Sequence, residues 1–429
     1  MKYYDNLIDY TNSLTIIDTH EHLPICEDMR VKSVDVLGEY LMQYLSSDLC
    51  SAGMDAKTLA FVKDESVPIM SRWMSAEPYW ENCRFTGYAR ALDLAAEKIY
   101  KIKRIDRTTI EQLNSDFLKA RSDGDCFEHI LKGICKIETS LLDCYYPDMY
   151  QIDKIDRTYF TPVLNTNIFI KPLSTEILDH FERELNIKIS CFDDYIEAVE
   201  KVIRRHAGEG SKLLKCSLAY NRPIEFRKVT KTDAECAFNS ALKGVIPSLD
   251  GSPARFAPER DFQDYIMHRI LHIANDLGMT FQFHTGLQEG NGNYISNSDP
   301  ELLSNLFLVY TNITFDLFHS SYPFQSKAAV LAKNFPNVCL DMCWSHIVSP
   351  RLSVNTLLEW LDLVPINKIS AFGGDYCFPD GVAGHQILAR QNIAEAFSVA
   401  CEKGIMCLDE AKACIKAILY DNPKRIFKL

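Results

Sequence analysis

The feature that most limits the possible folds of this 429-residue chain is a repeated alternation of short apolar segments with longer helical ones. The short segments carry β-branched or aromatic residues between polar or turn residues, which is typical of buried strands. They lie at 14–19, 136–143, 159–164, 212–220, 279–284, 312–318, 337–342 and 368–374. Alternating strands and helices predict a parallel sheet. Eight such units predict a (β/α)8 TIM barrel.

The segments between the later strands have helical spacing. In 259–277, apolar side chains recur at steps of three and four, and Gly278 follows as a C-terminal stop. The first two strands are instead separated by more than a hundred residues rich in helix formers and aromatics, too many for a structureless loop. We therefore predict a single barrel domain over 1–429, with 24–130 as a helical insertion over the C-terminal mouth of the barrel. The alternative is a separate helical domain with no part in the chemistry.

Charge and cysteine content restrict the partners and the compartment. With 58 Asp and Glu against 46 Lys and Arg, the net charge is −12, which disfavours nucleic acid and anionic membrane as partners. No apolar run is long enough for a membrane span. The first residues include Asp5 and Asp9 and do not resemble a signal peptide. The fifteen cysteines are scattered and form no CxxC pair, which is typical of reduced thiols in a cytoplasmic protein.

Side chains that can bind a metal stand at the C-terminal ends of four predicted strands. They are His20 and His22 on the first strand, His284 on the fifth, His319 on the sixth and Asp375 on the eighth. Strand alternation directs Asp18, His20 and His22 to the same side. Because the C-terminal strand ends of a barrel meet at one rim, we expect these groups to converge. Imidazole and carboxylate donors suit zinc and similar cations, so the pattern predicts a divalent metal site.

This order of residues resembles that of the amidohydrolase superfamily, whose barrels carry HxH on strand one, histidines on strands five and six, and aspartate on strand eight. The resemblance spans nearly the whole chain. It implies that His20, His22 and His284 are metal ligands and that His319 binds a second metal or polarises the substrate. It also implies that Asp375 contacts the metal and acts as general base. The implied cofactor is zinc, or manganese as second choice, as one or two ions.

Three local features are similar to the branch of this superfamily that borders the uronate isomerases. They are the long insertion, the Cys343-Trp344 pair after the seventh strand, and Asp375-Tyr376 after two glycines. Uronate isomerases often lack a histidine at the position of His319, so its presence here favours hydrolysis. In that reaction the metal lowers the pKa of a water molecule and Asp375 removes its proton.

Lys215 lies within the predicted fourth strand, on the face whose smaller polar residues suit a barrel interior. Superfamily members with two metals use a carboxylated lysine on this strand as a bridging ligand. If the strand runs through Tyr220, however, Lys215 precedes its end by about five residues, or roughly 16 Å, which is too deep. Two interpretations stay open: a bridging metal ligand, or a buried lysine that pairs with a carboxylate or reaches the substrate.

Further residues are candidates for contact with the substrate. They are Tyr220 and Arg222 after the fourth strand, Trp344 and His346 after the seventh, and Arg84 with Tyr88 in the insertion. An arginine can grip a carboxylate with two hydrogen bonds, so Arg222 favours an anionic substrate.

Together these features predict a metal-dependent hydrolase of a small, anionic amide, lactone or ester. On the same fold, the alternatives are a sugar-acid isomerase of the uronate type, a non-oxidative decarboxylase, and a binding barrel without catalysis. The full set of ligands disfavours the last alternative. The predicted partner is a small-molecule substrate, with no nucleic acid and no membrane, and a homo-oligomer is compatible with such a barrel.

Overall fold

The computed structural model describes residues 1–30, 34–143, 154–171, 175–243 and 259–429. Eight strands form one sheet in chain order, and each neighbouring pair is parallel. The strands are β1 (Ile16–Glu21), β2 (Ile137–Asp143), β3 (Phe160–Asn165), β4 (Leu213–Cys216), β5 (Thr280–Phe283), β6 (Thr314–Leu317), β7 (Val338–Asp341) and β8 (Ile369–Ser370). All eight predicted strands are confirmed, and so is the barrel.

Backbone hydrogen bonds between β1 and the segment after β8 bring the two ends of the sheet together. The N–H of Thr19 donates to the carbonyl of Phe372 at 3.0 Å, and the N–H of Asp375 donates to the carbonyl of His20 at 2.8 Å. Because the strands are parallel, their carboxyl ends lie at one rim. The last strand therefore delivers Asp375 directly beside the histidines of the first strand.

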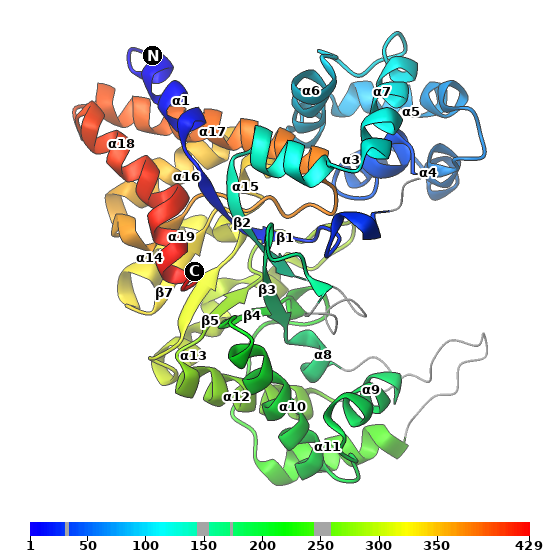
Figure 1. The fold of residues 1–429 in the computed structure, drawn as a ribbon. Helices are drawn as coiled ribbons and strands as arrows, with labels where there is room; N and C mark the ends of the chain where they lie inside the picture. The colour runs from blue at the N-terminus through cyan, green and yellow to red at the C-terminus, as the bar shows by residue number, and fades with distance from the viewer. Residues whose placement is uncertain (31–33, 144–153, 172–174, 244–258) are drawn as a thin grey trace.

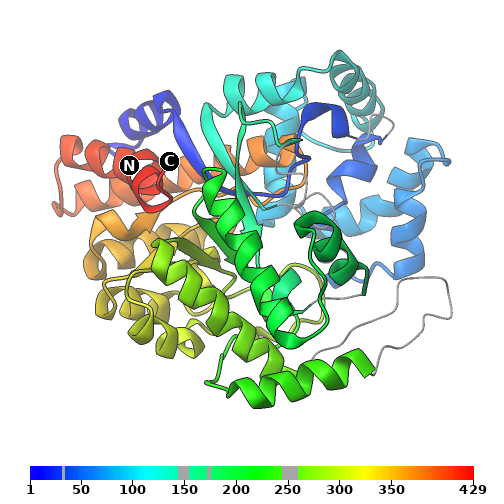
Figure 2. The same ribbon diagram turned by 60° about the horizontal axis from the view of Figure 1, so that its bottom comes forward.

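Helices surround the barrel (Figures 1 and 2). Those outside the first insertion are α1 (Tyr4–Ser13), α8 (Asn167–Ile170), α9 (Thr175–Leu185), α10 (Phe192–Gly208), α11 (Lys231–Lys243), α12 (Arg260–Leu277), α13 (Ser304–Val309), α14 (Gln325–Asn334), α15 (Ser345–Val348), α16 (Pro350–Leu363), α17 (Pro379–Glu402), α18 (Leu408–Lys416) and α19 (Asn422–Ile426). The predicted stop at Gly278 is confirmed, since this residue ends α12 in the left-handed conformation. None of the helices in the described ranges combines the length and the apolarity needed to cross a membrane.

The chain between β1 and β2 is helical, and in Figure 1 its helices gather on one side of the barrel. They are α2 (Val36–Tyr40), α3 (Leu45–Ser51), α4 (Ala56–Lys63), α5 (Ile69–Cys83), α6 (Gly87–Tyr100) and α7 (Ile110–Asp123), followed by a π-helical segment at Phe127–Ile134. Helix α6 packs along α17 and against α15. This contact attaches the helical segment to the barrel beside its carboxyl-terminal rim.

Two strands are shorter than the sequence suggests. The fourth ends at Cys216 because the chain turns, and the carbonyl of Leu218 accepts hydrogen bonds from the N–H groups of Asn221 and Arg222. The eighth ends at Ser370 because the N–H of Ala371 donates to Ile418 rather than to a neighbouring strand. The early end of β4 places Lys215 next to the rim.

Candidate metal centre

A cavity of about 280 Å³ opens at the carboxyl ends of the strands, where barrels of this kind carry their active sites. Its wall combines strand ends with side chains from the helical segment and from loops. The lining residues are His20, His22, Gln43, Tyr44, Asp143, Asn167, Lys215, Ser217, Tyr220, Asn221, His284, Glu289 and Asp375.

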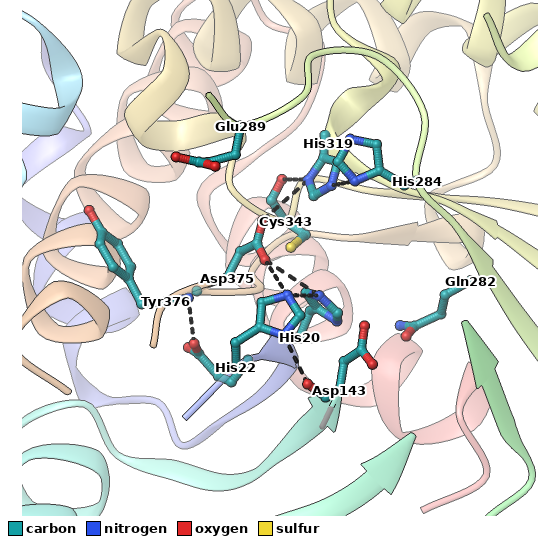
Figure 3. A network of polar contacts seen from close by, with 12 residues as sticks. His20, His22, Asp143, Gln282, His284, Glu289, His319, Cys343, Asp375 and Tyr376 are labelled. Carbon is teal, nitrogen blue, oxygen red and sulfur yellow. Dashed lines mark hydrogen bonds and ion pairs between the residues drawn. The ribbon is translucent and has the colours of Figure 1, made fainter. Parts of the chain in front are cut away.

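The histidine pair of β1 and Asp375 converge in this cavity (Figure 3). Atoms His20 Nε2 and His22 Nε2 lie 3.2 Å apart, and Oδ1 of Asp375 lies 3.4 Å from each of them. The other nitrogen of His22, Nδ1, lies 2.8 Å from the carbonyl oxygen of Asp143, to which it donates. In the neutral ring this bond leaves Nε2 of His22 as the atom with the lone pair, a pattern typical of metal-binding histidines. The three residues therefore fit a divalent cation.

Two acidic side chains of β1 hold the segment that carries Asp375. Asp18 accepts a hydrogen bond from the N–H of Gly374 at 3.1 Å, and Glu21 accepts one from the N–H of Tyr376 at 2.8 Å. Between them, Asp375 has a φ of 59°, in the left-handed region that costs a non-glycine residue free energy. Such a conformation persists only where its surroundings impose it. The first strand thus supplies both the histidines and the hold on the carboxylate.

The charges of the site suit metal binding. Burial alone would raise the pKa of Asp375, but the hydrogen bond with His22 and the nearby rings of His20 and His319 outweigh it, and the pKa lies well below its usual range. Burial lowers the pKa of His20 well below its usual value and that of His319 to about 4. Burial also acts to lower the pKa of His22, but the hydrogen bond with Asp375 and the charge of Asp143 raise it overall. Metal binding requires the neutral ring of His22, in which Nε2 carries the lone pair.

His284 and His319 form a second pair of facing rings. Their Nδ1 and Nε2 atoms, respectively, lie 3.0 Å apart. The remaining nitrogens donate to backbone carbonyls, of Leu287 at 2.8 Å and of Cys343 at 3.1 Å. Burial lowers the pKa of both rings, so both are neutral and their facing nitrogens both carry lone pairs. Two lone pairs cannot hydrogen-bond to each other, and a shared cation would satisfy both.

The two histidine pairs are joined through Asp375. Nδ1 of His319 lies 4.0 Å from Oδ2 of Asp375. His284 lines the cavity, whereas His319 lies behind its wall and is 1% exposed. The structure therefore brings all five predicted strand-end residues together, and their roles as ligands stay predictions.

Lys215 enters the same cavity from β4. Its Nζ lies 3.6 Å from the centre of the Phe318 ring, and the residue is 2% exposed. The expectation that it lies too deep is wrong, because the strand ends one residue later, at Cys216. Burial lowers the pKa of Lys215, while the charges of Asp143 and Asp375 oppose this shift. Carboxylation of Lys215 stays a prediction.

Three residues expected at the substrate lie elsewhere. Arg222 donates to the buried carboxylate of Asp264 at 2.6 Å. Arg84 pairs with Glu81 at 3.0 Å on α5, and His346 is buried with its Nε2 2.9 Å from a backbone carbonyl. Each of the three side chains has a hydrogen-bond partner within the protein, and none of the three lines the cavity.

The aromatic candidates lie at the cavity or just behind it. Tyr220 lines the cavity, with its ring 4.7 Å from that of His284. Trp344 lies behind the wall and stacks on Tyr44 at 4.9 Å and on Tyr88 at 6.2 Å. Tyr44 in turn lines the cavity and donates a hydrogen bond to the carbonyl of Asp375. Trp344 and Tyr88 therefore support the wall rather than form it.

Sequence reasoning missed several residues of the wall. Asp143 carries the same signal as Asp375, an acid at the end of a predicted strand, and the same rule would have found it. The others are Gln43 and Tyr44 between α2 and α3, Asn167 and Ser217 after β3 and β4, Asn221, and Glu289 after β5. Their positions follow from the paths of loops, which have no periodic signal.

An eight-stranded parallel barrel with histidine and carboxylate donors at its carboxyl-terminal rim has the architecture of a metal-dependent TIM-barrel protein. Residues 218–429 match the model of the amidohydrolase family. The second half of the chain is thus similar to the amidohydrolase family, and the barrel has the fold of the uronate isomerases.

Among curated proteins, the chain is similar to protein fluG of Emericella nidulans, with 25% identity over 223 residues, which are 50% of this chain and 25% of that protein. It is also similar to a uronate isomerase of Shouchella clausii, with 22% identity over 307 residues, which are 68% of this chain and 62% of that protein. The chain thus spans less than two thirds of the length of either relative.

Among solved structures, the uronate isomerase of Thermotoga maritima is similar over 99% of this chain and 97% of that one, with a TM-score of 0.81 and 14% identity. The glucuronate isomerase of Caulobacter crescentus is similar over 100% and 94%, with a TM-score of 0.77 and 17% identity. At these identities the likeness concerns the fold.

Proposed function

We propose that this protein is a metal-dependent hydrolase of a small polar amide, lactone or ester. The observation that carries the proposal is the ionised carboxylate of Asp375, 3.4 Å from the Nε2 atoms of both His20 and His22. A divalent cation held by these residues would lower the pKa of a water molecule and polarise the substrate carbonyl. The match of residues 218–429 to the amidohydrolase family supports the same chemistry.

The residues of the chain then have distinct roles. Asp375 accepts the proton of the attacking water and passes it to the leaving group. Lys215 is the one lysine or arginine among the described residues of the cavity wall, so it faces the oxygen that gains negative charge or the anionic end of the substrate. The amide groups of Asn167 and Asn221 offer hydrogen bonds to the rest of the substrate.

The negative charge of the cavity wall limits how many anionic groups the substrate can carry. With Arg222 engaged by Asp264, the wall contains three carboxylates, those of Asp143, Glu289 and Asp375. A substrate with several anionic groups would be repelled by them unless it was neutralised by the cation. We therefore propose a substrate with at most one anionic group, oriented toward Lys215.

A second candidate is isomerisation of a sugar acid. It is supported by the likeness of the fold to uronate isomerases over nearly the whole chain and by the amide and hydroxyl groups of the cavity wall, which suit a polyhydroxylated substrate. In this case Asp375 would move a proton between adjacent carbons of the substrate. A single anionic group of such a substrate would still face Lys215.

One experiment separates the two. The zinc- or manganese-loaded protein is incubated with D-glucuronate, D-galacturonate and a panel of lactones, esters and N-acyl compounds, in heavy-oxygen water and separately in deuterium oxide. Hydrolysis places solvent oxygen in the product, whereas isomerisation places solvent deuterium on carbon. Turnover that survives in His20→Ala would overturn both proposals, and His272→Ala, which changes an exposed histidine of α12, is the control.

A further inference from the structure

Asp143 ends β2 and brings a second carboxylate to the histidine pair of β1. One donor atom each of His20, His22 and Asp143 lies within 4.8 Å of the other two. Figure 3 shows the side chains of Asp143 and Asp375 approaching the two rings from different directions. Ligands on opposite sides of one cation, at bond lengths of about 2.1 Å, are roughly 4.2 Å apart. Donor atoms that lie within 4.8 Å of one another therefore need only a small inward shift to share an ion.

The contacts of Asp143 leave its carboxylate free to bind such an ion. Both oxygens accept a hydrogen bond from Nδ2 of Asn165 at 3.1 Å, and Asp143 is 1% exposed yet lines the cavity. An ionised carboxylate can accept about four hydrogen bonds, and a buried charge is costly unless it is paired. The amide of Asn165 thus orients the carboxylate without saturating it.

We infer that Asp143 is a further ligand of the divalent cation that the proposed function requires, so that two imidazoles and two carboxylates hold the ion. The second strand supplies no ligand in the pattern that the chain resembles, and this inference rests on the proposed function. Two carboxylates balance the two positive charges of the cation. Carboxylate oxygen suits manganese better than it suits zinc, so Asp143 contributes more to the affinity for manganese.

The test compares Asp143→Asn with Glu289→Gln in the 429-residue chain after a chelator has removed its metal. Each change removes one carboxylate charge from the same cavity wall, but Glu289 does not belong to the close group of His20, His22 and Asp143. In Asp143→Asn the side chain retains an oxygen for the amide of Asn165, and the backbone carbonyl that orients His22 is unchanged. Affinities for Mn²⁺ and Zn²⁺ are measured by calorimetry, and bound Mn²⁺ by electron paramagnetic resonance.

Losing a residue that only supports a metal ligand typically weakens metal binding by roughly 10- to 100-fold. We expect Asp143→Asn to weaken Mn²⁺ binding by at least this factor and Zn²⁺ binding by a smaller one. The affinities of Glu289→Gln for Mn²⁺ and Zn²⁺ should stay close to those of the unmodified protein. Equal affinities in the two variants would overturn the inference while leaving the proposed function intact. Absence of metal binding by the unmodified protein would overturn both.

A measurement on the unmodified protein covers the case in which Asp143→Asn does not fold. A crystal structure with Mn²⁺, located by its anomalous scattering, should place an oxygen of Asp143 at about 2.0–2.2 Å from the ion. An ion bound to His20 and His22 but lying beyond bonding distance of Asp143 would overturn the inference.

Discussion

Helices α6 and α17 touch so closely that no side chain fits between them at Gly384. A β-carbon on Gly384 would lie 1.9 Å from the carbonyl oxygen of Ala91 in α6. Such contacts are not found below 3.0 Å, so Gly384→Ala requires α6 to move by more than an ångström. Because the obstacle is backbone rather than a flexible side chain, we expect a loss of about 2–3 kcal/mol in the free energy of unfolding. Helix α6 also carries Tyr88, which stacks on Tyr44 of the cavity wall.

Urea unfolding followed by circular dichroism measures this loss. The matched control is Gly208→Ala at the end of α10, where a β-carbon meets nothing within 4 Å. There the higher helix propensity of alanine should leave stability unchanged or raise it by up to about 1 kcal/mol. If Gly384→Ala unfolds at the same urea concentration as the unmodified protein, the close approach of α6 to α17 is not a constraint, and the reasoning fails.

Three further predictions concern pairing, pH and metal. Arg222→Ala should leave KM unchanged but lower the free energy of unfolding in urea by about 1–3 kcal/mol, because the buried carboxylate of Asp264 loses a partner. A large rise in KM would instead indicate that Arg222 binds the substrate. Burial lowers the pKa of His206 from 6.5 to about 4, so the unfolded chain binds this proton first, and stability should fall by about 3 kcal/mol as the pH drops from 6.5 to 4. The variant His206→Gln should not show this part of the loss of stability at low pH. If its stability depended on pH in the same way as that of the unmodified protein, the lowered pKa of His206 would be contradicted. Zinc at 100 times its Kd should stabilise the protein by about 2.7 kcal/mol, and the gain should vanish in His22→Ala, as measured by thermal unfolding with and without chelator.

The order of the strands and the ends at which the chemistry lies could be predicted from the sequence. Strand alternation in 18–22 and the terminal positions of His284, His319 and Asp375 are local features, and parallel strands necessarily bring such ends to one rim. The same rule applied to Asp143 would have added a second carboxylate.

The sequence could not predict which of the residues proposed to contact the substrate actually line the cavity. Arg222 and Asp264 are separated by 42 positions, and no sequence feature near Arg222 indicates that its partner is a buried aspartate on α12. His346 likewise follows a strand, but its ring turns inward, to a carbonyl of residue 371. Polar side chains bind whichever partner the fold brings within reach, and that partner is often remote in the chain.

The sequence alone determined the barrel, the order of its strands and the rim where the histidines and Asp375 gather, because residue spacing along a strand or helix is set by backbone geometry. Only the tertiary structure decided that β4 ends early enough for Lys215 to reach the cavity and that Tyr44 from the helical segment completes its wall. These features depend on where loops turn and which distant groups they meet. Residue spacing does not predict these contacts, because the residues that form them are far apart in the chain and come together only when the chain folds.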